Sequence, residues 1–394
     1  MLSSFIMKSD FEIKKFFLPY GRHDIDEEDL EAVRTVLLSD WLTTGPKVEE
    51  FEQKVAKISG AEFGAAVNSG TAALHAAMAA IGIKPGDEVI VPPITFAATA
   101  NAVVYQGGIP VFADVDPETL LIDPVKTKEK ITSKTRAVIA VDYAGQMCDY
   151  DVLREITKKN GIYLIADACH SIGGSYKGSP SGSCADLTVF SFHPVKHITT
   201  GEGGMVVGSN KELIRRVKIF RNHGISDDLH QRQKKESWHY EIEMPGFNYR
   251  LTDFQCALGI TQLKKLESRI QKRNFLAKQY DLFFEEIDGI APLKKEAFGL
   301  HAYHLYVVKL DLGFLKKSRL EIFSSLRNEG IGVNVHYIPV HYHPFYKKTF
   351  NTSKGLCPIA EEAYEQILTL PLFPSMTKED VKKVCSLVQK SVNF

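Results

Sequence analysis

This chain of 394 residues lacks an excess of charge of either sign. Its 48 lysine and arginine residues balance its 48 aspartate and glutamate residues, so the net charge is zero at pH 7 with histidine neutral. Without a basic excess, the main electrostatic argument for binding nucleic acid or an anionic membrane surface is missing. We therefore expect a small metabolite as the ligand.

Cysteine is also scarce, and it is scattered along the chain. The sequence contains no C-x-x-C pair and no tight spacing typical of a zinc site or a disulfide framework. Isolated cysteines of this kind indicate reduced thiols, as in cytoplasmic proteins. The six cysteines are Cys148, Cys169, Cys184, Cys256, Cys357 and Cys385.

Long apolar runs are absent as well. The longest, at residues 72–83, is interrupted by His75 and is far shorter than the roughly 20 residues that span a bilayer. Charged residues such as Lys8, Asp10 and Glu12 interrupt the first turns, so no apolar core of an export signal is evident. We expect a cytoplasmic protein whose partners include neither a membrane nor a nucleic acid.

Short apolar runs alternate with helical stretches between residues 63 and 208. This alternation is typical of an α/β fold. The run VIAV at 138–141 is apolar at every position, which indicates a strand covered on both faces, as in a mostly parallel sheet flanked by helices. Ligands of such sheets bind at the carboxyl ends of the strands.

Helices and a second unit are expected around this sheet. Asp26 and Asp29 predict a capped helix whose apolar face carries Leu30, Val33 and Leu37. A long helix is predicted from residue 253 through 268 and beyond.

Beyond about residue 270 the order of elements changes. Residues 304–310 alternate like a half-exposed strand, 320–328 and 378–389 read as helices, and 332–336 as a short strand. We expect a large α/β domain at 21–265, a small α+β domain at 266–394 and an N-terminal extension at 1–20. The polar segment 227–243 is a candidate loop that orders over substrate.

Lys196 is the most informative residue of the sequence. It ends the motif SFHPVK at 191–196, and TTGEGG follows at 199–204. A lone lysine is most often a solvated surface residue, but this one follows an apolar strand and precedes four glycines at 201–208, where backbone and ligand can approach closely. A desolvated lysine beside other positive charge releases its proton readily and becomes a nucleophile.

Asp167 closes another apolar run, at residues 162–166. An aspartate after a strand often caps the next helix, and that alternative stays open. The residues that follow, ACHSIGG at 168–174, are rich in glycine for a helix start, and a carboxylate is costly to bury unless it is paired. The pyridinium nitrogen of pyridoxal phosphate (PLP) would be such a partner, and its aldehyde reacts with a lysine amine.

Two further features fit a PLP site without requiring one. NSGT at 68–71 opens an alanine-rich helix, and capping by Ser69 and phosphate binding by Gly70 and Thr71 use the same free N–H groups. Phe96, in PPITF at 92–96, is suited either to stack on a cofactor ring or to pack in the core. Spacing alone favours the core.

Six motifs, in order, resemble the DegT/DnrJ/EryC1/StrS family of sugar aminotransferases, which are fold type I PLP-dependent transferases. The resemblance covers nearly the whole chain. Within the family, the runs at 193–204 and 336–341 are most similar to the branch that acts in pseudaminic acid biosynthesis. The six motifs are LTTGP at 42–46, NSGTAAL at 68–74, DACH at 167–170, SFHPVK at 191–196, GEGG at 201–204 and GFNYRLTD at 246–253.

The resemblance implies a role for each motif. It makes Lys196 the lysine that forms a Schiff base with PLP and Asp167 the partner of the pyridinium nitrogen. Related dehydratases carry histidine where this chain has Lys196. The implied cofactor contacts are Phe96 on the ring, His170 near the ring hydroxyl, Gly70, Thr71 and Ser191 at the phosphate, and Asn248 reaching the phosphate from the second subunit of a homodimer. The implied substrate contacts are Thr43, Thr44, Tyr249, Arg250, His336 and His341.

The resemblance further implies an amino transfer in two halves. L-Glutamate is the expected donor, and the C4 ketone of a UDP-linked 4-keto-6-deoxy-2-acetamido sugar is the expected acceptor. A UDP-4-keto-pentose or a dTDP-4-keto-6-deoxyhexose stays open as the substrate, because sugar identity depends on a few pocket contacts. A protein that binds the cofactor as a sensor or scaffold is the alternative from another class.

Overall fold

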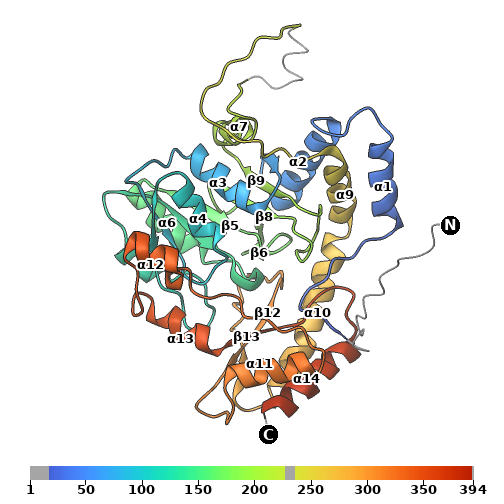
Figure 1. The fold of residues 1–394 in the computed structure, drawn as a ribbon, viewed down its shortest axis with the longest axis vertical. Helices are drawn as coiled ribbons and strands as arrows, with labels where there is room; N and C mark the ends of the chain where they lie inside the picture. Colours follow the sequence, from blue (N-terminus) through green and yellow to red (C-terminus); the bar gives the residue numbers. More distant parts are fainter. Residues whose placement is uncertain (1–16, 227–235, 393–394) are drawn as a thin grey trace, which may run out of the picture.

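The computed structural model describes residues 17–226 and 236–392 (Figure 1). The predicted extension at 1–20 and the polar segment at 227–243 thus lie partly outside the described residues. Seven strands form one sheet in the order β1-β9-β8-β5-β4-β2-β3. β9 is antiparallel to both of its neighbours and the other adjacent pairs are parallel, so the prediction of a mostly parallel sheet is confirmed. The strands are β1 (Phe63–Val67), β2 (Glu88–Val91), β3 (Ile109–Phe112), β4 (Thr135–Val141), β5 (Tyr163–Asp167), β8 (Leu187–Ser191) and β9 (Gly204–Gly208).

The centre of this sheet is buried on both faces. Every residue of β8 and β9 is buried, and β4 exposes only Arg136. Consecutive apolar residues suit these strands because helices and loops cover both sides. The helices between the strands are α3 (Gly70–Ala80), α4 (Ala98–Tyr105), α5 (Pro124–Glu129), α6 (Tyr150–Asn160) and α7 (Lys211–Phe220).

The predicted long helix is two helices in near continuity. α9 (Asp253–Lys264) begins at a capping box formed by Thr252 and Gln255, and α10 (Leu266–Phe284) follows after one residue. Lys265 separates them with φ of −97° and ψ of −4°. Figure 1 shows α10 running from the large sheet toward the C-terminal part of the chain.

α1 (Glu27–Leu37) begins at the predicted capping box but turns a different face inward. The structure buries Asp29 and Val36, whereas Leu30 and Leu37 are more than half exposed. The predicted apolar face is therefore wrong. Polar contacts with α9 explain why α1 turns this face inward. α9 packs on α1, and the Gln262 amide of α9 donates a hydrogen bond to the Asp29 carboxylate at 2.7 Å. The next helix, α2 (Pro46–Ser59), ends at Gly60 in the left-handed conformation.

The C-terminal part of the chain forms a smaller sheet with its own apolar cluster. β12 is central in the order β10-β12-β13, and α11 and α14 lie beside this sheet at the end of the molecule opposite α7 (Figure 1). The predicted boundary at residue 265 stays a prediction. The elements are β10 (Ile290–Pro292), β12 (Tyr306–Leu310), α11 (Arg319–Asn328), η2 (Val340–Tyr342), α12 (Pro344–Phe350), α13 (Pro358–Gln366), β13 (Ile367–Leu370) and α14 (Lys378–Val392), with a small sheet of β11 (Gly299–Leu300), β6 (Ser175–Tyr176) and β7 (Ser179–Pro180).

Two strand predictions fail in this region. β12 is buried at four of its five positions and is not half exposed, because it is the central strand and packs against helices. Residues 332–336 form no strand and contribute one bridge, between Asn334 and Thr369. In both places the sequence pattern is too short to show which neighbours cover the strand.

Two predicted absences can be compared with the structure. Across the described ranges, no helix is long and apolar enough to cross a membrane. All six cysteines are free thiols.

The loop after β4 makes a close approach to two other segments at Gly145. It contains the short helix η1 (Tyr143–Gly145), and Gly145 has φ of 103°. A Cβ atom at this position would lie 2.7 Å from the carbonyl oxygen of His170 and 2.8 Å from the backbone nitrogen of Tyr303. Glycine thus allows the β4 loop, the turn after β5 and the segment before β12 to meet.

The variant Gly145→Ala should therefore be destabilised in two ways. Positive φ alone costs about 1–2 kcal/mol for a residue with a side chain, and overlap with backbone atoms should add about 1–3 kcal/mol. Gly86→Ala is the matched control, because Gly86 has φ of 92° and open space where the Cβ would lie. Urea unfolding should show the larger loss for Gly145→Ala, and equal losses would contradict the close approach.

Candidate active site

Lys196 lies in the turn that connects β8 to β9, at the carboxyl edge of the sheet. Its backbone N–H donates to the carbonyl of His193 at 2.9 Å. The side chain keeps some exposure, but its amine is surrounded by protein, and this loss of water lowers the lysine pKa below its ordinary value. Arg273 lowers the pKa further, whereas Cys169 and Asp167 raise it to a lesser extent than burial lowers it. The uncharged amine needed for nucleophilic attack is favoured.

Imidazoles surround the Lys196 amine. Its Nζ lies 3.3 Å from Nε2 of His304, whose ring centre is 4.3 Å from that of His170. Nε2 of His170 in turn lies 3.2 Å from the hydroxyl of Tyr337. These residues come from the β8–β9 turn, the turn after β5 and two segments of the C-terminal region.

Asp167 ends β5 and is 6% exposed. Its Oδ2 accepts a hydrogen bond from the Thr99 hydroxyl at 2.7 Å, and its Oδ1 accepts from the backbone N–H of Cys169 at 3.3 Å. Within the described ranges, no basic side chain forms an ion pair with this carboxylate. A cationic ring nitrogen is the kind of partner that such a carboxylate requires.

The N-terminus of α3 meets the end of β8. The Ser69 hydroxyl accepts a hydrogen bond from the N–H of Ala72 at 3.1 Å. This cap does not engage the N–H groups of Gly70 and Thr71, the first two residues of the helix. A Cβ atom on Gly70 would lie 2.9 Å from Cβ of Ser191, so glycine is needed for this approach. Helix N–H groups and a serine hydroxyl together suit a phosphate.

Phe96 lies outside the core, and its stacking on the cofactor ring stays a prediction. Its side chain is 61% exposed, and its ring centre lies 6.1 Å from that of Tyr337. The core alternative is excluded, because a core phenylalanine would be covered.

The two other predicted histidines have different surroundings. His336 is 7% exposed and lies 2.9 Å from the hydroxyl of Thr369, and burial, followed by the charge of Lys196, lowers its pKa to about 4. His341 is fully buried and lies 3.0 Å from Glu361. The structure thus brings His336 near the lysine and gives His341 a partner within its own region, so a substrate contact by His341 stays a prediction.

The remaining predicted residues do not touch Lys196 or Asp167 within this chain. Asn248 is exposed and bridges to Asn222, and Arg250 donates to the side chain of Asn222 at 2.7 Å. The hydroxyl of Tyr249 lies 3.1 Å from Nδ1 of His75. Thr43 and Thr44 precede α2, and Thr43 bridges to Thr252.

The sequence interpretation missed His304, Tyr337 and Thr99. All three line the site through contacts between segments far apart in the chain. A usable signal for His304 was the pair of histidines in HAYHLYVV at 301–308, directly before an apolar strand. Thr99 and Tyr337 carried no comparable signal.

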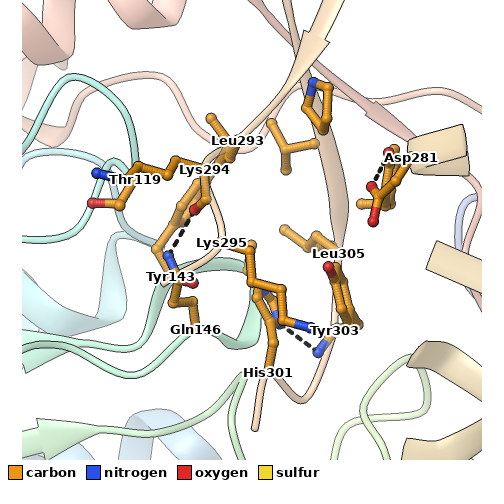
Figure 2. Close-up of a pocket in the computed structure, with 14 residues that line it drawn as sticks. Thr119, Tyr143, Gln146, Asp281, Leu293, Lys294, Lys295, His301, Tyr303 and Leu305 are labelled. Carbon is orange, nitrogen blue, oxygen red and sulfur yellow. Dashed lines mark hydrogen bonds between the residues drawn. The ribbon is translucent and has the colours of Figure 1, made fainter. Parts of the chain in front are cut away.

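A separate hollow is lined in part by the loop after β4 and by the segment before β12 (Figure 2). It lies between the β4 loop and residues 292–307, and the space of about 370 Å³ between its walls includes open solvent. Figure 2 shows Gln146 bonded to the backbone of Lys294 at its wall, with Lys295, His301 and Tyr303 opposite. None of the predicted site residues lines this hollow.

Comparison with known proteins decides the family. Residues 23–389 match the DegT/DnrJ/EryC1/StrS aminotransferase family. This chain belongs to that family. The resemblance found in the sequence motifs is confirmed, and with it the fold type and the cofactor.

Three relatives show how far the similarity extends. The chain is 41% identical over 381 residues to the spore coat polysaccharide biosynthesis protein SpsC of Bacillus subtilis, covering 96% of this chain and 98% of SpsC. Spr1654 of Streptococcus pneumoniae in its PMP form has a TM-score of 0.90 at 32% identity, with 95% of this chain and 99% of that chain covered. PseC of Helicobacter pylori, an aminotransferase involved in the biosynthesis of pseudoaminic acid, has a TM-score of 0.89 at 32% identity, with the same coverage.

The protein is therefore a PLP-dependent sugar aminotransferase. The residues present fit that cofactor. A desolvated lysine, a carboxylate without a cationic partner and a helix N-terminus beside a serine hydroxyl are the three groups that the aldehyde, ring nitrogen and phosphate of PLP require. Lys196, Asp167 and the N-terminus of α3 at Gly70 beside Ser191 would supply them.

Several histidines share one electrostatic feature: burial lowers the pKa of each imidazole below its ordinary value. The effect brings the pKa of His75 to about 4 and that of His301 to about 3. The set is His75, His170, His197, His301, His304, His336 and His341.

Acid should consequently destabilise the protein. Below about pH 6.5, the ordinary pKa of histidine, these imidazoles gain protons on unfolding but stay neutral in the fold. Asp142 opposes this in part, because burial raises its pKa to about 7 and its carboxyl then releases a proton on unfolding. Each net proton taken up lowers the free energy of unfolding by about 1.4 kcal/mol per pH unit. Urea unfolding of the cofactor-free protein should show this loss between pH 7 and pH 5; an unchanged free energy would contradict a neutral histidine cluster.

Proposed function

We propose that this protein transfers the amino group of L-glutamate to the C4 ketone of a UDP-linked 4-keto-6-deoxy-2-acetamido sugar, giving the 4-amino sugar nucleotide. The observation that carries the proposal is the desolvated Lys196 amine on the same sheet edge as the buried Asp167 carboxylate. Similarity to PseC supports the choice of substrate and a place in pseudaminic acid biosynthesis. Location in the cytoplasm stays a prediction.

Each residue has a chemical task in this proposal. PLP, when bound, carries the amino group between the two substrates and draws electrons from the carbon that loses a proton. Lys196 takes the proton from the α-carbon of the donor and later delivers a proton to C4 of the sugar. Asp167 would hold the ring nitrogen in its protonated form. Each unit by which the carboxylate raises the pKa of this nitrogen favours the protonated form by about 1.4 kcal/mol.

The remaining contacts orient the molecules. Gly70, Thr71 and Ser191 would hold the phosphate, and Phe96 would cover one face of the ring. His170 would lie near the ring hydroxyl.

Contacts with the sugar nucleotide are proposed for a larger set. The exposure of Asn248 supports its reaching a second copy of the chain, so the active unit would be a homodimer. The proposed sugar-nucleotide contacts are Thr43, Thr44, Tyr249, Arg250, His336 and His341.

The variant Lys196→Ala should abolish turnover while the protein still folds. The lysine is partly exposed and its side chain makes a single hydrogen bond among the described residues, so its removal should shift the thermal midpoint little. Turnover is measured by 2-oxoglutarate release and folding by thermal unfolding. Retention of a near-normal rate would remove Lys196 from the mechanism.

Substrate choice is tested by the visible spectrum of the PLP-loaded enzyme. The band of the bound aldehyde form should disappear with L-glutamate and return when the UDP-4-keto-6-deoxy-2-acetamido sugar is added. A UDP-4-keto-pentose and a dTDP-4-keto-6-deoxyhexose serve as competitors, and faster recovery with either would transfer the assignment to that sugar. A band that ignores glutamate would indicate another donor or a non-catalytic protein.

A further inference from the structure

The amine of Lys196 has one side-chain partner among residues 17–226 and 236–392. That partner is Nε2 of His304, at 3.3 Å. The two residues are 108 positions apart, and they lie next to strands of different sheets. His304 precedes β12, the central strand of the small sheet, whereas Lys196 follows β8 of the large one.

His304 is itself held on every side. Its side chain is 5% exposed, and its ring lies 4.3 Å from that of His170 and 5.7 Å from that of His197. Its backbone carbonyl accepts a hydrogen bond from the buried guanidinium of Arg273 at 3.3 Å. The next residue, Leu305, donates to the carbonyl of Ala144 at 3.1 Å. The imidazole therefore has a fixed position from which to hold a mobile amine.

The surroundings keep this imidazole uncharged. Burial and the neighbouring positive charges lower the pKa of His304 well below its ordinary value, so it offers the lysine a neutral nitrogen. Nδ1 of His304 is buried without a hydrogen-bond partner within the described part of the chain, so Nε2 is the nitrogen engaged. The titratable or charged groups facing the pair are Asp167, Cys169, His170, His197, Arg273 and His336.

We propose that His304 is the positioning residue of Lys196: its neutral Nε2 accepts a hydrogen bond from the lysine amine and holds it in place whenever the amine is not joined to the cofactor. The inference rests on the proposed role of Lys196. In that role the amine is free while substrate is on the cofactor, and a four-carbon chain without a partner would sample many rotamers. No proton passes to His304.

The test uses the cofactor-free protein and PLP itself, so it does not depend on amino transfer. The second-order rate constant for covalent attachment of PLP is followed by absorbance as a function of pH. The plateau at high pH reports how well the neutral amine is placed, and the midpoint reports the pKa of Lys196. The variants are His304→Leu, which removes the acceptor, and His304→Gln, which keeps one near the position of Nε2.

The proposal predicts a split between these variants. His304→Leu should lower the plateau at least tenfold and shift the midpoint to lower pH, because the ammonium form loses its acceptor. His304→Gln should recover most of the plateau. His301→Gln is the matched control, since His301 is an imidazole of the same segment that bonds to the backbone of Tyr303, and it should keep both values.

Two results would overturn the proposal. In the first, His304→Leu attaches PLP with the same plateau rate constant and pH midpoint as the unaltered protein. In the second, His304→Leu and His304→Gln attach PLP equally slowly and lose the same thermal stability, as expected of a purely structural role. Lys196→Ala separates this outcome from a failure of the proposed function. If Lys196→Ala still attaches PLP covalently, the lysine assignment fails; if it does not, the result on His304 stands alone.

Discussion

Loss of water around the Lys196 amine is the constraint on which the site depends. Desolvation favours the uncharged form of a lysine. Each unit by which the lysine pKa falls changes the free-energy difference between its charged and uncharged forms by about 1.4 kcal/mol. The same protein environment keeps His170, His304 and His336 uncharged. Burial thus favours the uncharged lysine although the Asp167 carboxylate acts in the opposite direction. The same burial has a cost, because the fold loses stability at a pH where these imidazoles gain protons on unfolding.

The two sheets build this environment together. The large sheet brings Lys196, Asp167 and the cap at Ser69 to one edge, since the carboxyl ends of its parallel strands coincide there. The segment before β12 supplies His304, and Gly145 lets the β4 loop pack directly against that segment. The placement of the lysine amine is thus tied to contacts between segments that begin far apart in the chain.

The groups that act locally were predictable from the sequence, and those that act across the fold were not. Asp167 ends the apolar strand β5, and Lys196 lies in the turn that follows the apolar strand β8. The apolar face of α1 was misread, because Asp29 is buried by a hydrogen bond from α9 that no local pattern reveals. For Phe96, spacing alone favoured the core whereas the family resemblance implied a place on the cofactor ring, and the structure leaves the side chain exposed. His304 was predicted as part of a strand. Its place in the site was missed because its partner, Lys196, lies 108 residues away.

The central claim is that Lys196 is the residue that joins the cofactor. The most direct measurement is to load the protein with PLP, reduce it with borohydride, digest it and locate the added pyridoxyl mass by tandem mass spectrometry. The account predicts a single modified peptide that contains the SFHPVK motif, with the added mass on Lys196. Modification of another lysine in its place, with Lys196 unmodified, would contradict the account.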